Sequence, residues 1–285
     1  MKPTDHIEEI LNLAEQGLRP IEIARKLNLV PVSVSQFLNR NGYNYSFKNQ
    51  GNIRYFQNID THEKAYVLGF IAADGYIVRS NKSSVTLGIQ INKEDISILN
   101  FIRNQIGSEK ELTYPNNKMV RFTLSNKELV QDLYNLGITQ RKSLTLTNVL
   151  KYFPSTFHPS FIAGYLDGDG CICKNNQVRK QFNKSKNTII EYPSLSTIIS
   201  FRGTKALLEA FIPVIGLTNY SSFHDGKTWN LRFSKHSEVI KFYNLYKKSP
   251  FKLNRKFNKL EAGVNLIFSK YLKDQTISSS FLKID

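Results

Sequence analysis

The sequence predicts an α+β fold of two tandem αββαββα repeats, preceded by a small three-helix domain. An apolar stretch that closes on Asp-Gly occurs twice, at 67–75 and 162–170, and its acids lie 169 − 74 = 95 positions apart. After each copy, strand-like and helix-like hydrophobic patterns follow in the same order. The chain before the first copy carries helical periodicity alone. We therefore expect a three-helix domain over 1–45, a linker over 46–62, a first repeat over 63–150, and a second repeat with a C-terminal tail over 151–285.

The N-terminal segment predicts three short helices, over about 5–16, 21–27 and 32–40, with a turn at 28–31. This arrangement resembles a helix-turn-helix, in which the last helix enters the major groove of DNA. A small helical interaction module is the alternative, and the sequence leaves both open. In the first case the residues that face DNA are Ser33, Ser35, Gln36, Asn39 and Arg40.

Each duplicated stretch predicts a helix with one face of small residues. Gly69 and Ala73 stand at i and i+4 in the first copy, and Gly164 and Gly168 do so in the second. Residues at this spacing lie on the same side of a helix, where another helix backbone can approach closely. We therefore expect the two helices to pair through these faces. Each is predicted to end at the glycine of Asp-Gly, in the left-handed conformation that often closes a helix.

The acid before that glycine, Asp74 or Asp169, then sits at a helix C-terminus, where the macrodipole is already negative. Pairing the helices brings the two carboxylates together, so the sequence predicts that a cation neutralises them. Oxygen ligands of this kind suit Mg²⁺ or Ca²⁺. A buried helix ending at an ordinary Asp-Gly turn is the simpler alternative. Its repetition at equivalent positions favours a functional role.

The remaining segments of both repeats predict two four-stranded antiparallel sheets, each covered by helices on one face. Residues 85–92 show the pattern most clearly, because apolar residues alternate with Thr86, Gly88, Gln90 and Asn92. In the first repeat we expect strands at 76–80, 85–92, 111–114 and 119–124, with helices at 94–106 and 126–136. In the second we expect strands at 171–174, 192–201, 220–224 and 228–233, with helices at 204–215 and 236–246, and a basic loop between the first two strands.

Composition narrows the class of protein. A net charge of +16 over 285 residues favours a polyanionic partner. No apolar run reaches the roughly 18 residues that span a bilayer, and the N-terminus lacks the apolar segment of a signal peptide. Cys171 and Cys173 are a poor disulfide pair at this spacing, and the histidines show no ligand pattern. We expect an intracellular protein, not a secreted or membrane protein, in a bacterium, a phage-infected cell or an organelle.

The two stretches, Val67-Leu-Gly-Phe-Ile-Ala-Ala-Asp-Gly75 and Ile162-Ala-Gly-Tyr-Leu-Asp-Gly-Asp-Gly170, resemble the signature of LAGLIDADG homing endonucleases in the single-chain, two-repeat form. The resemblance covers roughly residues 55–259. The acidic eighth position of the motif is filled by Asp74 and Asp169, while the sixth is Asp167 in one copy and Ala72 in the other. The resemblance implies a pseudo-twofold monomer whose paired motif helices and two sheets form a saddle over double-stranded DNA. It also implies an origin in an intron, an intein or a free-standing mobile element, and we expect an intron product or a free-standing enzyme over an intein.

The resemblance further implies a site-specific endonuclease that makes a staggered, metal-dependent double-strand break. Asp74 and Asp169, with the carbonyl groups of Ala73 and Gly168, would hold Mg²⁺. Mn²⁺ would substitute for it, and Ca²⁺ would bind without supporting cleavage. The alternative is a non-cleaving binder of DNA or RNA with the same fold, either an intron maturase or a transcription regulator.

Basic and polar residues complete the predicted site. Lys127 and Lys235 follow the fourth strand of each repeat, near the point where the family places a basic residue close to the scissile phosphate. The basic stretches 141–142 and 252–256, which end the two repeats, either contact phosphate or form solvated faces. Arg, Gln and Asn pair with base edges in the major groove. The residues expected on the open sheet faces are Ser80, Lys82, Gln90, Asn92, Arg121, Asn175, Gln177, Arg179, Arg202 and Arg232, each with a solvated surface role as its alternative.

Overall fold

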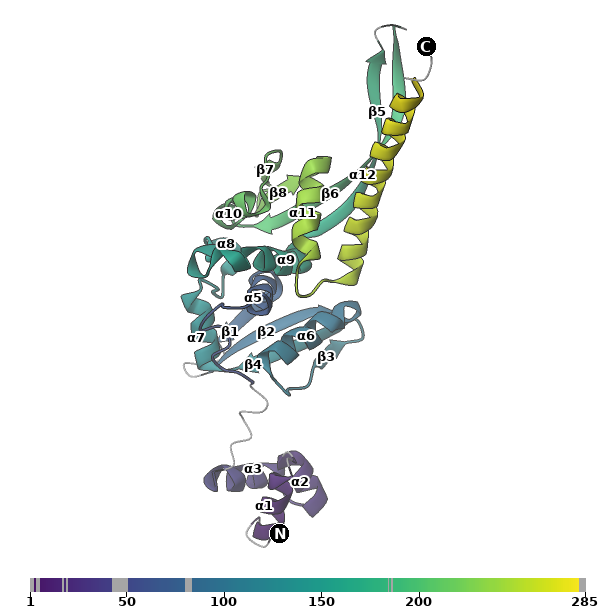
Figure 1. Cartoon of the computed structure of the whole chain (residues 1–285). Coiled ribbons are helices and arrows are strands. Elements are labelled where there is room, and N and C mark those ends of the chain that lie inside the picture. Colours follow the sequence, from purple (N-terminus) through teal and green to yellow (C-terminus); the bar gives the residue numbers. More distant parts are fainter. Residues whose placement is uncertain are drawn as a thin grey trace. The chain divides into compact units, whose positions relative to one another are not determined.

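The structure is a computed structural model that describes residues 3, 6–16, 18, 20–42, 51–79, 84–183, 185 and 187–281. It divides into two compact units, Met1–Asn52 with Ile106–Glu111, and Ile53–Gln105 with Leu112–Asp285 (Figure 1). None of its helices is long and apolar enough, over the residues just given, to cross a membrane.

The first unit contains the three predicted helices: α1 (Ile7–Glu15), α2 (Pro20–Leu27) and α3 (Pro31–Arg40). Their apolar faces meet in a small core that includes Ile10, Ile23 and Leu38, all fully buried. Asn28 takes the left-handed conformation at φ 53° after α2, so the chain turns and enters α3 at Pro31. The hydrophobic spacing alone therefore located these helices to within two residues.

The second unit holds two four-stranded antiparallel sheets, ordered β1-β2-β4-β3 and β5-β6-β8-β7, on either side of a central helix pair (Figure 1). The first repeat consists of α5 (His62–Asp74), β1 (Gly75–Arg79), β2 (Val85–Asn92), α6 (Ile96–Ile106), β3 (Thr113–Asn116), β4 (Met119–Ser125), α7 (Lys127–Asn135) and α8 (Lys142–Thr145). The second consists of α9 (His158–Asp169), β5 (Cys171–Asn183), β6 (Thr188–Gly203), α10 (Lys205–Ile215), β7 (Ser221–His224), β8 (Trp229–Phe233), α11 (His236–Lys247) and α12 (Asn254–Phe281).

The identical strand order in the two sheets confirms the predicted α+β fold of two repeats. Strand β2 alternates as expected, with Val85, Leu87, Ile89 and Ile91 buried on the helix-covered face. Gly216 ends α10 in the left-handed conformation at φ 73°, again as expected. In both repeats, therefore, one sheet face packs against helices and the other is left open.

Three segments differ from the sequence-based expectation. The predicted basic loop between the first two strands of the second repeat is largely strand, because β5 and β6 pair continuously from Cys171↔Ser200 to Asn183↔Thr188. The predicted C-terminal tail contains the 28-residue helix α12. Part of the predicted linker belongs to the second unit, where Tyr55, Phe56 and Ile59 are buried. These three buried residues were not recognised as part of the core because the residues around them in the sequence are mostly polar.

Candidate active site

Helices α5 and α9 cross at backbone contact distance, through the predicted glycine faces. A Cβ atom on Gly164 would lie 2.9 Å from the carbonyl carbon of Tyr66 and 3.0 Å from the amide nitrogen of Phe70. A Cβ atom on Gly69 would likewise lie 2.8 Å from the carbonyl carbon of Phe161. Each glycine thus packs on the residue three positions before the other glycine. This reciprocal contact is what a twofold relation between the repeats requires.

Both motif helices end at the acid, but not in the predicted left-handed conformation. Gly75 and Gly170 are extended, with φ near −68° and −77°; Gly75 begins β1, and Gly170 directly precedes β5. A Cβ atom on either would lie 2.6 Å from a carbonyl oxygen of its own helix, that of Ile71 or Leu166. Glycine is therefore needed here for close backbone approach and not for positive φ. Each acid therefore lies where its motif helix meets the first strand of its sheet.

The two acids lie together in different surroundings. Asp74 is half-buried and Asp169 is exposed. Burial, followed by the negative charge of Asp169, raises the pKa of Asp74 to about 6. Gly168 also packs on this end of α5, since its Cβ would lie 3.5 Å from the carboxyl carbon of Asp74. The helix pairing thus brings one carboxyl group from each repeat to one place.

Two buried lysines provide the positive charge at these helix ends. The Lys142 ammonium group donates to the carbonyl oxygens of Ala72, at 2.7 Å, and of Ala73. The Lys256 ammonium group donates to four carbonyl oxygens that end α9, including those of Leu166 at 2.6 Å and Gly168 at 3.0 Å. The protein thus places two cations of its own at these helix ends, where the sequence predicted Mg²⁺ or Ca²⁺; the metal stays a prediction.

The lysine pair was only partly recognisable in the sequence. Lys142 and Lys256 lie in the basic stretches that end the repeats, for which phosphate contact and a solvated face were equal alternatives. Burial lowers the pKa of Lys142, and lowers that of Lys256 to about 8, while the nearby acids oppose the shift. The lysines predicted to act in the site, Lys127 and Lys235, are instead exposed at the N-terminal ends of α7 and α11. Their role stays a prediction.

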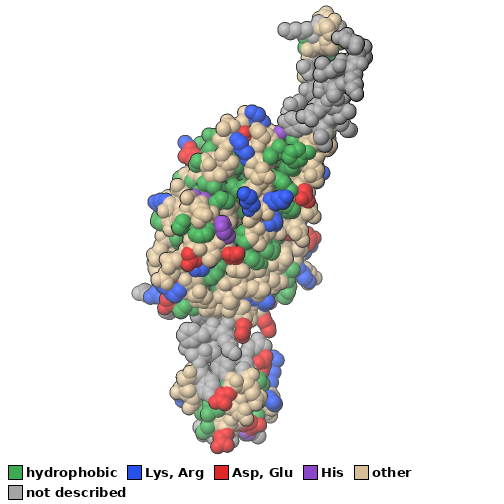
Figure 2. Space-filling view, viewed as in Figure 1, with side chains coloured by type: hydrophobic (Ala, Val, Ile, Leu, Met, Phe, Trp, Pro, Cys, Tyr) green, Lys and Arg blue, Asp and Glu red, His purple; other side chains and the backbone are tan. Residues whose placement is uncertain are grey.

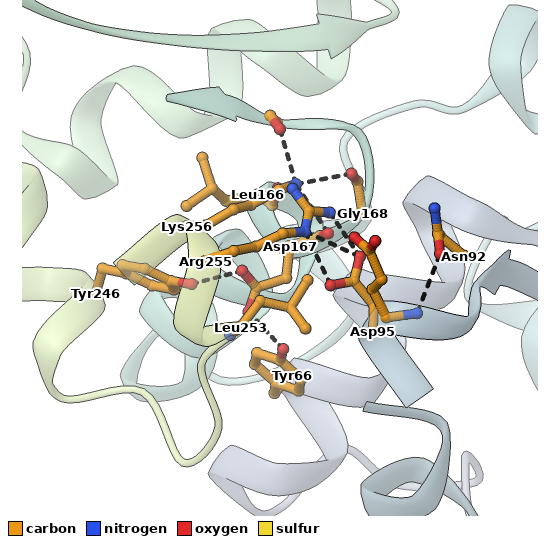
Figure 3. Close-up of polar contacts among 12 residues, drawn as sticks. Tyr66, Asn92, Asp95, Leu166, Asp167, Gly168, Tyr246, Leu253, Arg255 and Lys256 are labelled. Atoms are coloured by element: carbon orange, nitrogen blue, oxygen red, sulfur yellow. Dashed lines mark hydrogen bonds and ion pairs between the residues drawn. The ribbon is translucent and has the colours of Figure 1, made fainter. Parts of the chain in front are cut away.

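The acid at the sixth motif position, Asp167, is 2% exposed and holds the chain around it (Figure 3). It accepts hydrogen bonds from the hydroxyl groups of Tyr66, at 2.6 Å, and Tyr246, and from the backbone amide of Leu253 at 3.2 Å. These bonds fix the segment that leads into α12 and Lys256. Nearby, Arg255 forms a bidentate ion pair with Asp95 of the first repeat. Asp167 therefore has a structural role, and Ala72 can replace it in the other copy.

The open sheet faces carry several of the predicted polar residues. Arg121 and Gln90 stand opposite each other on β4 and β2 and are hydrogen-bonded at 2.6–2.8 Å. Asn92 is exposed and caps the short turn that follows β2. Asn175 is half-buried on β5. For Gln177 and Arg179 the structure describes the backbone alone, and Ser80 and Lys82 lie outside the described residues.

Two adjoining hollows that share Asp169, Arg202 and Asp225 form a groove over the second sheet. Its lining includes Asp169, Lys142, Arg202 and Arg232, together with the thiols of Cys171 and Cys173. Arg202 stands opposite Asn230 and lies 3.7 Å from the carboxylate of Asp225, while Arg232 stands opposite Ser200. Figure 2 shows further Lys and Arg side chains in several groups over the visible face of the second unit. The groove thus joins Asp169 to a polar, basic surface.

The three-helix segment of the first unit carries no net charge, unlike the rest of the chain. Residues 1–42 contain five basic and five acidic residues, so the whole net charge of +16 belongs to residues 43–285. On α3, the residues predicted to face DNA divide into half-buried Ser33 and Ser35 and exposed Gln36, Asn39 and Arg40. The exposed three, with Val32 at 63% exposure, form the accessible side of this helix.

The residues at the helix ends fit a hard divalent cation. The carbonyl oxygens of Ala73 and Gly168 accept lysine hydrogen bonds, but each has a second lone pair. No group of three or more His, Cys, Asp or Glu side chains suited to a metal occurs in the described part of the chain. The two carboxylates and two carbonyl groups would therefore leave coordination positions for water or phosphate, as Mg²⁺ prefers.

No protein-family model matches the chain, and no curated protein sequence does. Among solved structures, it is similar to the I-SmaMI LAGLIDADG homing endonuclease bound to cleaved DNA, with a TM-score of 0.53 and 14% identity over 75% of this chain and 93% of that one. It is also similar to the I-LtrWI LAGLIDADG homing endonuclease bound to target DNA, with a TM-score of 0.53 and 13% identity over 78% of this chain and 92% of that one. For I-SmaMI bound to its uncleaved DNA target in the presence of calcium ions, the TM-score is 0.51 and the identity 13%, over 74% of this chain and 92% of that one. The chain therefore has the fold of the two-repeat LAGLIDADG homing endonucleases.

Proposed function

We propose that the chain is a site-specific endonuclease that makes a staggered double-strand break in DNA by metal-dependent phosphodiester hydrolysis. The observation that carries the proposal is the meeting of Asp74 and Asp169 at the adjoining ends of α5 and α9, one acid from each repeat. Because the repeats are related by their reciprocal helix contacts, each acid would serve one strand of the duplex. The protein would act as a monomer, since both halves of the site lie in one chain.

The chain's own residues would position the phosphates and balance their charge. The open faces of the two sheets, with pairs such as Gln90 and Arg121, would contact base edges and phosphates. Lys142 and Lys256 would stabilise the negative charge that grows on the phosphate during hydrolysis, because their ammonium groups are already fixed beside the acids. Asp167 would act as a positioning residue that holds Lys256 in place.

Mg²⁺ is the proposed cofactor, held by Asp74, Asp169 and the free lone pairs of the Ala73 and Gly168 carbonyl oxygens. When bound, it would lower the pKa of water and neutralise phosphate charge. Mn²⁺ would substitute for it, and Ca²⁺ would support binding alone. In the first unit, the exposed side of α3 would add contacts to flanking DNA as a helix-turn-helix does.

The proposal is tested by incubating the full chain with a library of randomised duplexes in Mg²⁺, in Ca²⁺ and in chelator. Sequencing the ends of cleaved molecules and the duplexes retained in Ca²⁺ identifies the target. We expect staggered ends in Mg²⁺ and intact, bound duplex in Ca²⁺. Selective binding without cleavage in Mg²⁺ or Mn²⁺ would show instead a non-cleaving binder of this fold, such as a maturase or a regulator.

A further inference from the structure

The backbone beside Lys256, in the second repeat, is fixed by a side chain of the first repeat. Lys256 follows Arg255, whose guanidinium group donates to the Asp95 carboxylate through Nε, at 2.8 and 3.0 Å, and through Nη2, at 2.6 Å (Figure 3). Asp95 is buried in the first repeat. A bidentate pair of this kind is directional as well as strong, so it orients the start of α12.

An aromatic contact joins the same two parts of the chain. Phe251, which precedes α12, stacks on Phe101 of α6 with the ring centroids 4.7 Å apart, and it packs on Tyr66 of α5 at 5.7 Å. The segment that leads to Lys256 therefore packs against helices of the first repeat. Of these contacts, the Asp95–Arg255 pair lies nearest to Lys256 in the sequence.

Lys142, in the first repeat, is held in the reciprocal way. The hydroxyl group of Thr204, in the second repeat, donates to the carbonyl oxygen of Leu146. The amide of Leu146 in turn donates to the carbonyl oxygen of Lys142 at 2.9 Å. The contact made by Thr204 thus lies one helical turn from this lysine.

Asp95 and Thr204 occupy equivalent places in the two repeats. Asp95 directly precedes α6, the helix that follows β2, and Thr204 directly precedes α10, the helix that follows β6. Each side chain bonds the other repeat close to the lysine at the end of its motif helix. Because the exchange occurs in both directions, it follows the twofold relation between the repeats.

We propose that Asp95 and Thr204 are positioning residues, each of which holds in place the lysine of the other repeat. Lys256 at the end of α9 then depends on the first repeat, and Lys142 at the end of α5 depends on the second. Neither lysine is fixed until the repeats have packed together, so the two halves of the site form as one. Only the consequence for strand cleavage rests on the proposed function, because the positioning can be measured without DNA.

The test without DNA is the rate of reductive methylation of each lysine in the folded full chain, measured by mass spectrometry. Lys142 and Lys256 are 8% and 5% exposed, so both should react slowly in the wild type. We expect Asp95→Asn to raise the Lys256 rate about tenfold and Thr204→Val to raise the Lys142 rate about fivefold, because each opens one local contact. The other lysine should change less than about twofold in each variant.

Conservative variants separate positioning from general loosening. Thr204→Ser keeps the hydroxyl group and should restore the protection of Lys142. Arg255→Lys keeps the charge of the exposed partner but loses the bidentate geometry, so it should raise the Lys256 rate by a smaller factor than Asp95→Asn. It also provides the test of the first contact if Asp95→Asn does not fold.

Two further variants are matched controls. Glu238→Gln neutralises a buried carboxylate that bonds Thr218 and Lys241 instead of the chain beside either lysine. Asn126→Ala removes the cap of α7, as Thr204→Val removes that of α10. Neither control should expose Lys142 or Lys256. Unchanged labelling in Asp95→Asn and Thr204→Val, or an equal rise at both lysines in either variant, would overturn the proposal.

Strand-resolved cleavage of a selected duplex in Mg²⁺ gives the second readout. At saturating protein, Asp95→Asn should slow by about tenfold the strand that Lys256→Met slows, and Thr204→Val the strand that Lys142→Met slows. Affinity for the duplex in Ca²⁺ should stay within about twofold of wild type. Equal slowing of both strands by Asp95→Asn would overturn the proposal. Wild-type protein that cleaves neither strand would count against the proposed function instead, and the labelling rates would then decide the positioning.

Discussion

Gly164→Ala tests the helix crossing that places the two acids. In an isolated helix this change would stabilise the protein by about 1 kcal/mol, because alanine is the better helix former. At the crossing, the new Cβ would lie 2.9 Å from the Tyr66 carbonyl carbon and 3.0 Å from the Phe70 nitrogen, and nearer still to the Tyr66 carbonyl oxygen. Ordinary contact begins near 3.4 Å, and the carbonyl oxygen is the nearest of these atoms, so the helices must separate by about 1 Å or more.

The obstructing atoms are backbone, so no flexible side chain can yield. Overpacking of a core costs about 1–3 kcal/mol, and a backbone obstruction belongs at the upper end of that range. After the gain of about 1 kcal/mol in helix propensity, we expect a net loss of about 2 kcal/mol in the free energy of unfolding. Urea denaturation measures it, with an unchanged m value as the check on two-state behaviour.

A control separates propensity from packing. Ala262 is exposed on α12, so Ala262→Gly should cost only about 1 kcal/mol. The double variant Gly69→Ala/Gly164→Ala should lose less than the sum of its single losses, because one separation of the helices relieves both contacts. A Gly164→Ala protein more stable than wild type would refute the close pairing of α5 and α9.

Other variants test the surroundings of the acids. Tyr246→Phe removes one donor to the buried Asp167 carboxyl group and should lower the free energy of unfolding by about 1.5–3 kcal/mol in urea. Cleavage should rise through pH 6 as Asp74 loses its proton and fall above pH 8 as Lys256 loses its charge, so rates measured from pH 5 to 9.5 should be bell-shaped. The burial that lowers the Lys256 pKa also means that the unfolded chain binds more protons between about pH 8 and 10.5. Stability relative to Lys256→Met should therefore increase over that range. Deleting residues 1–45 should leave cleavage intact and make the dependence of log affinity on log salt shallower, and an unchanged slope would indicate a different partner for α3.

The sequence predicted the features that depend on local pattern. Small residues four apart on two apolar stretches predicted the helix pairing, because that spacing puts them on one face of a helix, where a second helix can approach closely. The alternation in 85–92 predicted a strand with one buried face, and the structure has that strand at the same residues. The acids could be placed for the same reason, since each ends its helix.

Features that depend on distant contacts could not be predicted in this way. Lys142 lies 70 positions from Ala72, and Lys256 lies 88 from Gly168, so nothing local distinguished them from surface lysines. The conformation of Gly75 and Gly170 is extended because the chain that follows passes close to the carbonyl groups of its own helix. The sequence pattern does not show this close approach. The β5–β6 hairpin resembled a basic loop in the sequence because Lys174, Arg179 and Lys180 interrupt its few apolar residues.

Strand-resolved cleavage by Asp74→Asn and Asp169→Asn tests the central claim most directly. On a selected duplex in Mg²⁺, neither variant should produce double-strand breaks, because each acid is proposed to hold the metal for hydrolysis. Both should bind that duplex in Ca²⁺ within a few-fold of wild-type affinity, since the sheet faces are unchanged. Double-strand cleavage at the wild-type rate by either variant would contradict the assignment of these acids and the mechanism built on them.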